Sequence, residues 1–436
     1  MNERSTAFHS WFPVLPFLGY WALAYTAFHF GPFETPSIST QTHIFFLLSM
    51  ALFVIGYRRG IGTNLDRVQE WSRVAEVASA EKLARPAIWL MFIGTSLLVF
   101  DRLISGAGSV ELVRTQMANL RQDYVDNTTI LTTLAVIPQS FYLVALASYF
   151  YCLKSLVVLP LRIHMLVVLA LCIEIFNMVL SANRGALLWI ATYALFYAFF
   201  CARLSITRDI FAKRNALKLA VFVLFCSVSF AYFLYVAENR EVESTVNYLG
   251  REASFLLKDN LASGADDYGN LAARYQIFSY LTHGFPYLDV VYQNAPLIHL
   301  DLLSPLGVRV EAQIARFIPD YMFPAKEKIV MWIQSAGLSR YNWVSTFGAA
   351  LTFFGILGAL IFFLLLGFSA GYATRRTLQT NKLGWFILTF TIYASLNMSF
   401  DWILRNFDQF VALAIAFYLI ARRSRAAFTI RSPAVV

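Results

Sequence analysis

Arginines are concentrated in the polar segment from residue 237 to residue 344, which separates two long apolar runs. This segment contains six arginines and only three lysines. A guanidinium group binds phosphate oxygens through two parallel hydrogen bonds, whereas the ammonium group of lysine acts as a point charge. The composition therefore favours a surface that binds phosphate. The arginines that we weigh as phosphate ligands in this segment are Arg240, Arg274 and Arg340.

A further arginine site is predicted at the tight turn Ser181-Ala182-Asn183-Arg184-Gly185, which separates two other apolar runs. Gly185 permits the backbone geometry of the turn and lets the next helix begin at once. The free N–H groups of a helix N-terminus favour an anion. Arg184 would hold a phosphate together with this N-terminus, or it would reach lipid headgroups alone.

Glu174 is predicted to lie in the outer half of the membrane, below this turn. Glu174, Asn177 and Ser181 are spaced three and four residues apart, so they share one face of a helix. An ionisable group at this depth is costly in lipid and is a candidate for function. Glu174 would either orient Arg184 through a salt bridge or accept a proton.

Arg114 and Arg121 lie in another polar link, seven residues apart. In a helix they would face the same way. They would clamp one pyrophosphate together, or they would form a solvated charged face.

Three residues of segment 237–344 could transfer a proton: His283, Asp289 and Glu311. His283 stands between Thr282 and Gly284, a polar setting that suits a group approaching a substrate. The sequence does not choose between the three. It contains no His/Cys cluster at zinc spacing, no Walker loop and no dinucleotide fingerprint, so metal, nucleotide and other cofactor chemistry is disfavoured.

The elements that must position these residues are membrane helices. Of the 436 residues, 58% are hydrophobic and only 14% are charged. A soluble domain could not bury this many hydrophobic side chains away from water. A helix needs about 20 apolar residues to cross the hydrocarbon core. We predict an all-α polytopic membrane protein with one membrane domain over residues 1–436 and about ten transmembrane helices. The predicted spans are Trp11 to Phe30, Thr42 to Tyr57, Ala87 to Ile104, Thr129 to Leu153, Val158 to Leu180, Ala186 to Ala202, Leu217 to Val236, Trp343 to Tyr372, Leu383 to Asn397 and Trp402 to Ile420.

The distribution of lysine and arginine predicts the orientation. These residues gather in the links 58–86, 203–218 and 375–382 and at the C-terminal end, which all fall on one side under the ten-span count. That side is expected to be the cytoplasm, so both termini are cytoplasmic. The segment 237–344, between spans 7 and 8, then faces outward as a lid. The net charge of +9 is mostly orientation charge and needs no nucleic acid to explain it.

Two regions are predicted to form short helices at the membrane surface. Apolar residues recur at near-helical spacing from Leu65 to Val77, which predicts a helix along the headgroups within the cytoplasmic link. In the lid, the apolar stretches Tyr287 to Tyr292 and Ala295 to Leu306 predict short helices that dip into the interface.

With these residues identified, the chain resembles the bacterial O-antigen polymerase family, whose members polymerise oligosaccharide repeat units. The turn at Ser181 to Leu188 is similar to the family's Ser-x-x-Arg-Gly entry into a helix. The large outward segment follows the next span, as it does in the family. The motifs Ser345-Thr346-Phe347-Gly348 and Phe353-Phe354-Gly355-Ile356-Leu357-Gly358 resemble the pattern at the end of the family's loop, although Phe354 stands where an acidic residue is usual.

The resemblance implies a metal-independent glycosyltransferase of the bacterial inner membrane with a GT-C-like architecture. The donor would be a glycan on undecaprenyl pyrophosphate and the acceptor a lipid-linked repeat unit, in the biosynthesis of lipopolysaccharide. The implied partners are these lipid-linked oligosaccharides, membrane lipid and a chain-length regulator. The arginines would meet the charge on the departing pyrophosphate, and His283, Asp289 or Glu311 would take the proton of the attacking hydroxyl.

Two other functions remain open at this point. An O-antigen ligase would use the same donor but transfer the glycan to a lipid A core. A polysaccharide flippase or exporter would carry charged or broken helices at the midplane and matched halves, which the sequence does not indicate.

Overall fold

The structure is a computed structural model, and every regular element that it describes is a helix. It describes residues 10–31, 35, 37–62, 73–104, 130–155, 157–180, 185–201, 231, 278, 282, 284–301, 314, 318, 321–322, 324–336, 345–380, 382–397 and 407–429. The helices are α2 (Leu15–Phe30), α3 (Thr40–Ile61), α4 (Arg73–Ile104), α7 (Ile130–Ser140), α8 (Tyr142–Lys154), α9 (Leu161–Leu180), α10 (Gly185–Phe196), the π-helix η1 (Tyr197–Cys201), α13 (Gly284–Asn294), α15 (Pro324–Ser335), α16 (Thr346–Thr380), α17 (Leu383–Asn397) and α18 (Phe407–Thr429).

Four stretches within this described part are long and apolar enough to cross a membrane. They are Thr40–Ile61, Ser79–Asp101, Leu134–Lys154 and Thr346–Thr380. The third stretch includes α8 and most of α7, which meet at a turn at Phe141 three residues after Pro138. The protein is therefore a helical membrane protein by the length and composition of its helices.

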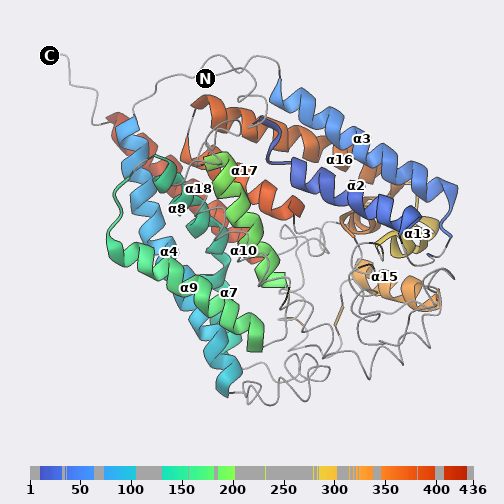
Figure 1. Cartoon of the computed structure of the whole chain (residues 1–436), viewed down its shortest axis with the longest axis horizontal. Helices are drawn as coiled ribbons and strands as arrows, with labels where there is room; N and C mark the ends of the chain where they lie inside the picture. The colour runs from blue at the N-terminus through green and yellow to red at the C-terminus, as the bar shows by residue number, and fades with distance from the viewer. Residues whose placement is uncertain are drawn as a thin grey trace.

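α3 and α16 form the closest helix pair, and α2 lies beside them (Figure 1). Gly56 and Gly60 of α3 face the backbone of α16, and Gly367 and Gly371 of α16 face the backbone of α3. Added Cβ atoms at these positions would overlap backbone carbonyl oxygens of the partner helix, so both helices need glycine here. Small residues four positions apart are typical of membrane helices whose backbones approach closely.

α16 is interrupted at Gly355, where the backbone has φ 68° and ψ −177°. A side chain rarely adopts this conformation, so glycine is favoured at the break. Residues 296–301, which we name the strap, run along the break. They form four backbone hydrogen bonds with it: Ile356 N to Pro296 O (3.1 Å), Leu357 N to Leu297 O (3.0 Å), His299 N to Phe354 O (3.2 Å) and Asp301 N to Phe353 O (2.8 Å).

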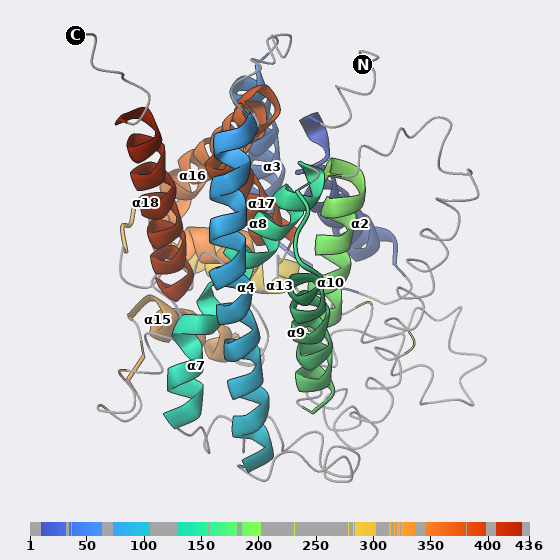
Figure 2. The ribbon, with the colours of Figure 1, turned by 90° about the vertical axis from the view of Figure 1, so that its left-hand side faces the viewer.

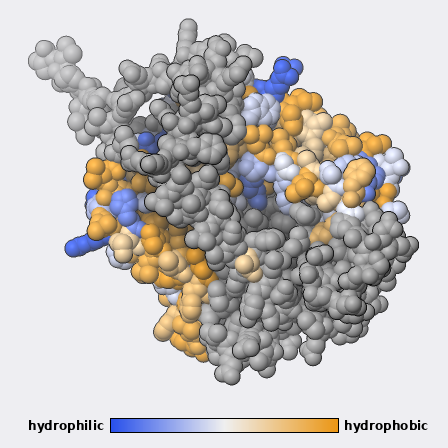
Figure 3. Space-filling view, in the orientation of Figure 1, coloured by the Kyte–Doolittle hydropathy of each residue, from blue (hydrophilic) through white to orange (hydrophobic). Residues whose placement is uncertain are grey.

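A second group of helices, α4 with α7 to α10, α17 and α18, packs around a separate apolar core. α4 crosses this group and contacts α7, α8 and α9, while α18 lies against α4 and α7 (Figure 2). Phe386, Phe390 and Tyr393 of α17 fill the centre of this core. In Figure 3 the described surface over α4, α7 and α9 is mainly hydrophobic, as a lipid-facing surface should be.

The predicted spans and the observed helices differ mainly at their ends. The span predicted from Thr42 to Tyr57 is the 22-residue helix α3, and the one predicted from Trp11 is a shorter helix of 16 residues that begins at Leu15. The link 58–86 is shorter than predicted, because α3 extends to Ile61 and α4 begins at Arg73. The helix predicted along the headgroups is not separate in its described part: from Arg73 it continues through Pro86 into the span. Most of the span predicted from Leu217 to Val236 lies outside the described residues.

Within segment 237–344 one predicted short helix is confirmed, and the other is wrong over the part that the structure describes. The stretch from Tyr287 to Tyr292 lies in α13. The stretch from Ala295 is not helical over residues 295–301. It pairs instead with the break in α16, whose exposed backbone groups compete with a local helix for the same hydrogen bonds.

Candidate functional site

Asp289 of α13 is the carboxylate that joins α13 to the start of α3. Its Oδ1 accepts hydrogen bonds from the backbone N–H of Ser39 (3.0 Å), the Ser39 hydroxyl (2.7 Å) and the Thr42 hydroxyl (2.6 Å). Its Oδ2 accepts one from the Gln293 amide (2.7 Å). The Asp289 side chain is buried, with 9% of the residue exposed, and both of its oxygens are engaged. It therefore clamps α13 to the N-terminus of α3, where a negative charge is favourable.

Ser39 gives this clamp its local basis in sequence. It is the N-cap of α3, and its side-chain oxygen accepts a hydrogen bond from the backbone N–H of Thr42 at 3.3 Å. Ser and Thr are preferred at this position because their oxygens satisfy N–H groups that the first turn leaves free. The cap also arranges the two hydroxyl groups that bind Asp289.

Four aromatic side chains, one from each of α2, α3, α13 and α16, pack together and hold α13 in place. They are Trp21, Phe46, Phe285 and Phe347, which we name the aromatic box. The ring centroids of Trp21 and Phe347 are 4.9 Å apart, those of Phe46 and Phe347 5.0 Å, and those of Phe46 and Phe285 5.1 Å. Edge-to-face and tilted pairs at these distances are favourable beyond the area they bury.

Two histidines that the sequence analysis did not select lie beside the clamp. The Tyr25 hydroxyl and Nδ1 of His43 are 3.1 Å apart, and the rings of His29 and His43 have centroids 5.0 Å apart. Asp289 lies close enough to His43 to interact electrostatically with it. When Tyr25 donates the hydrogen bond, His43 carries its proton on Nε2. His29 is exposed and His43 partly exposed, so a bound molecule could reach both side chains.

A sequence signal for the pair existed. His29 lies near the end of one apolar run and His43 near the start of the next, and the ends of two helices joined by a short link meet in space.

Glu174, in α9, lies among tyrosines. Its carboxylate interacts electrostatically with the hydroxyls of Tyr142 of α8 and Tyr193 of α10. The rings of these two tyrosines have centroids 5.6 Å apart; Tyr193 is buried and Tyr142 partly buried, and both hydroxyl oxygens are buried. Glu174 thus faces the core between α8 and α10. A salt bridge to Arg184 remains a prediction, because Arg184 lies outside the described residues.

Most of the other predicted site residues are also outside the part of the chain that the structure describes. These are His283, Glu311, Arg114, Arg121, Arg240, Arg274 and Arg340. The two that it does describe, Asp289 and Glu174, belong to different apolar cores: α13 contributes to the core of α2, α3 and α16, and α9 to the second core.

Within the described ranges, no group of three or more His, Cys, Asp or Glu residues could hold a metal ion. Comparison with known proteins found no matching family model, no matching curated protein and no matching solved structure.

Proposed function

We propose that this protein is a membrane glycosyltransferase that polymerises lipid-linked oligosaccharide repeat units. It transfers the growing glycan from undecaprenyl pyrophosphate to an incoming lipid-linked unit at the outer face of the bacterial inner membrane. The proposed protein has about ten transmembrane helices in a GT-C-like arrangement. Both termini are in the cytoplasm, and segment 237–344 is outside.

One observation carries this proposal: α13, from segment 237–344, is clamped by Asp289 to the end of α3 that has no lysine or arginine. Arg58 and Arg59 lie in the last turn of that helix, at its opposite end. Gly62, just beyond them, lies against the guanidinium of Arg375 near the end of α16. The arginines of α3 and α16 thus lie at one end of this helix pair, and α13 of segment 237–344 is attached at the other end. This arrangement supports a lid that faces outward, because the positive-inside rule keeps arginines on the cytoplasmic side.

The chemistry of the proposal needs cations for the leaving group and one base. Breaking a sugar–phosphate bond leaves a pyrophosphate, and arginines held at a water-poor surface stabilise its growing charge. The residues proposed for this role are Arg184, Arg114, Arg121, Arg240, Arg274 and Arg340.

The base must accept the proton of the attacking hydroxyl. Asp289 already accepts four hydrogen bonds, which supports a positioning role for it. His43, whose ring is partly exposed, joins His283 and Glu311 as a candidate base.

The test is a polymerisation assay with purified protein and synthetic undecaprenyl-pyrophosphate-linked repeat units. A ladder of products on a gel is the expected result. Product formed only when lipid A core is supplied would identify a ligase. Movement of the lipid-linked unit across a vesicle membrane without any ladder would identify a flippase.

A further inference from the structure

The strap presents apolar side chains outward although its backbone is fixed to a membrane helix. Leu297, Ile298 and Leu300 are 61%, 72% and 67% exposed. His299, which stands between Ile298 and Leu300, is partly buried. The strap therefore pairs with α16 through its polar backbone and exposes these three apolar side chains. Such a group of large exposed apolar residues marks an interaction surface.

The strap continues the exposed apolar stripe of α16. Leu357, Ile361 and Leu365 are spaced four residues apart, so they share one face of the helix, and they are 42%, 58% and 57% exposed. The backbone N–H of Leu357 donates to the carbonyl of Leu297. The outward residues of the strap therefore adjoin the face of α16 that meets lipid in a membrane-spanning helix.

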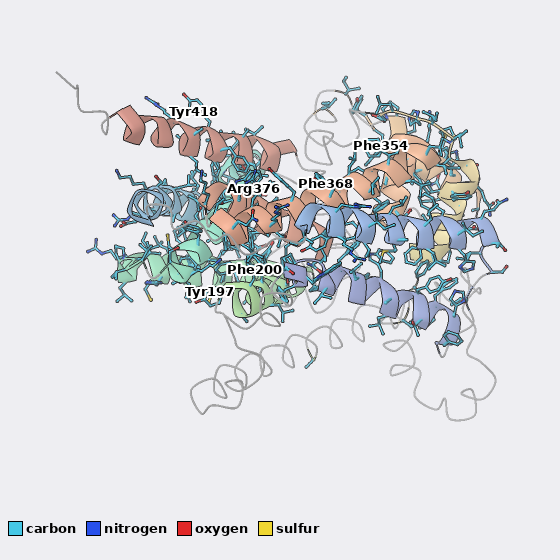
Figure 4. All side chains as sticks on the ribbon, turned by 90° about the horizontal axis from the view of Figure 1, so that it is seen from above. Tyr197, Phe200, Phe354, Phe368, Arg376 and Tyr418 are labelled. Carbon is cyan, nitrogen blue, oxygen red and sulfur yellow. The ribbon has the colours of Figure 1, made fainter. Side chains whose placement is uncertain are left out.

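The position of the break along α16 gives the depth of the strap. From Gly355 to Arg375 the helix advances 20 residues, or about 30 Å at 1.5 Å per residue, which matches the thickness of the hydrocarbon core. Figure 4 shows Phe354, Phe368 and Arg376 distributed along α16, with Phe354 and Arg376 toward its two ends. With Arg375 and Arg376 at one headgroup layer, the break and the strap lie at the other boundary of the core.

The backbone of a non-helical segment is tolerated at this depth only when its polar groups are bonded within the protein. The break at Gly355 meets that condition, because it frees Ile356 N and Leu357 N to donate and Phe353 O and Phe354 O to accept. The strap supplies the complementary groups. A Cβ at residue 355 would lie 2.7 Å from the carbonyl oxygen of Pro296, so glycine also permits the close approach.

We propose that the strap is a lipid-binding element that inserts Leu297, Ile298 and Leu300 among the acyl chains of the bilayer, at the boundary opposite Arg375 and Arg376. The partner is the bilayer itself. The proposal does not depend on the proposed glycosyltransferase activity.

Spin-label accessibility in vesicles tests the insertion. The four native cysteines are replaced by alanine, and a nitroxide is attached to Ile298→Cys, to Ile361→Cys on the stripe of α16, or to Gln334→Cys on the exposed surface of α15. Each full-length variant that elutes as a single species is reconstituted into phosphatidylcholine and phosphatidylglycerol vesicles. Collision with oxygen, which concentrates in the bilayer, is compared with collision with a water-soluble nickel chelate.

The label at residue 298 is expected to resemble that at residue 361, with oxygen collisions at least several-fold more frequent than nickel collisions, and to differ from that at residue 334. Nickel accessibility equal to that at residue 334 would place the strap in water and overturn the proposal. Protection from both reagents would also overturn it, because protein would then cover the strap. Dipolar broadening between labels at residue 298 would identify that cover as a second copy of the chain.

Discussion

Asp289 is a buried carboxylate whose two possible roles, positioning and proton transfer, have different consequences when it is mutated. Asp289→Asn removes the charge that strengthens the hydrogen bonds from Ser39 and Thr42. We expect the variant to lose roughly 1.5–3 kcal/mol of stability, since hydrogen bonds to a charged group contribute about that much. The measurement is the midpoint of thermal unfolding in detergent.

Gln293→Ala is the matched control, because it removes only one of the four hydrogen bonds to the same carboxylate. It should lower the unfolding midpoint by less than Asp289→Asn does. An Asp289→Asn protein with an unchanged midpoint and no polymerisation would contradict the positioning role and identify Asp289 as a base.

Arg184 is the arginine for which the turn, the helix N-terminus and the family resemblance agree. Arg184→Ala is expected to leave the protein folded and inserted in the membrane but to abolish polymerisation, because the pyrophosphate would lose its cation. Glu174→Ala should reduce activity less if Glu174 only orients Arg184. The comparison is made on thermal unfolding and product ladders with the same preparations. Normal polymerisation by Arg184→Ala would show that the arginine only reaches lipid headgroups.

At the scale of elements, the contact between α3 and α16 depends on glycines that cannot be enlarged. Gly371→Ala places a Cβ against the carbonyl oxygen of Tyr57, and the rigid helix backbones leave little room for adjustment. We expect a loss of about 1–3 kcal/mol, typical of overpacking. Gly19→Ala in α2 is the control, because no atom lies within 4 Å of its new Cβ.

The two glycine variants should shift the unfolding midpoint in opposite directions. Alanine is favoured over glycine in a helix by up to about 1 kcal/mol, so Gly19→Ala should raise the midpoint slightly, whereas Gly371→Ala should lower it. Equal shifts would mean that α3 and α16 do not approach as closely as the structure places them.

At the scale of the whole molecule, the orientation in the membrane decides whether the proposed site faces the periplasm. A single cysteine at Asn294, the last residue of α13, should react with an impermeant thiol reagent added to intact spheroplasts. A cysteine at Lys382, in the basic link before α17, should react only after the membrane is opened. Both positions are exposed, so a difference between them reports on sidedness. The reverse pattern would refute the proposed function as a whole.

The sequence by itself determined that the protein is helical and membrane-embedded and where most of the described helices lie. Hydrophobic length is a local property, so the run from Leu383 to Asn397 could be delimited to the residue, and the apolar stretch after Tyr287 could be recognised as helical. Helix ends were less predictable, because capping and tertiary contacts extend or shorten a helix beyond its apolar run, as they do at the two ends of α3.

Only the tertiary structure decided which distant residues meet. Ser39 and Asp289 are separated by 250 positions, and nothing in the local sequence of either specifies the other. The strap was predicted to be a helix because its composition is apolar, yet the open backbone groups at Gly355 bond it in a non-helical form. In both cases the partner lies far along the chain, and a buried polar group must be satisfied by whatever the fold brings to it.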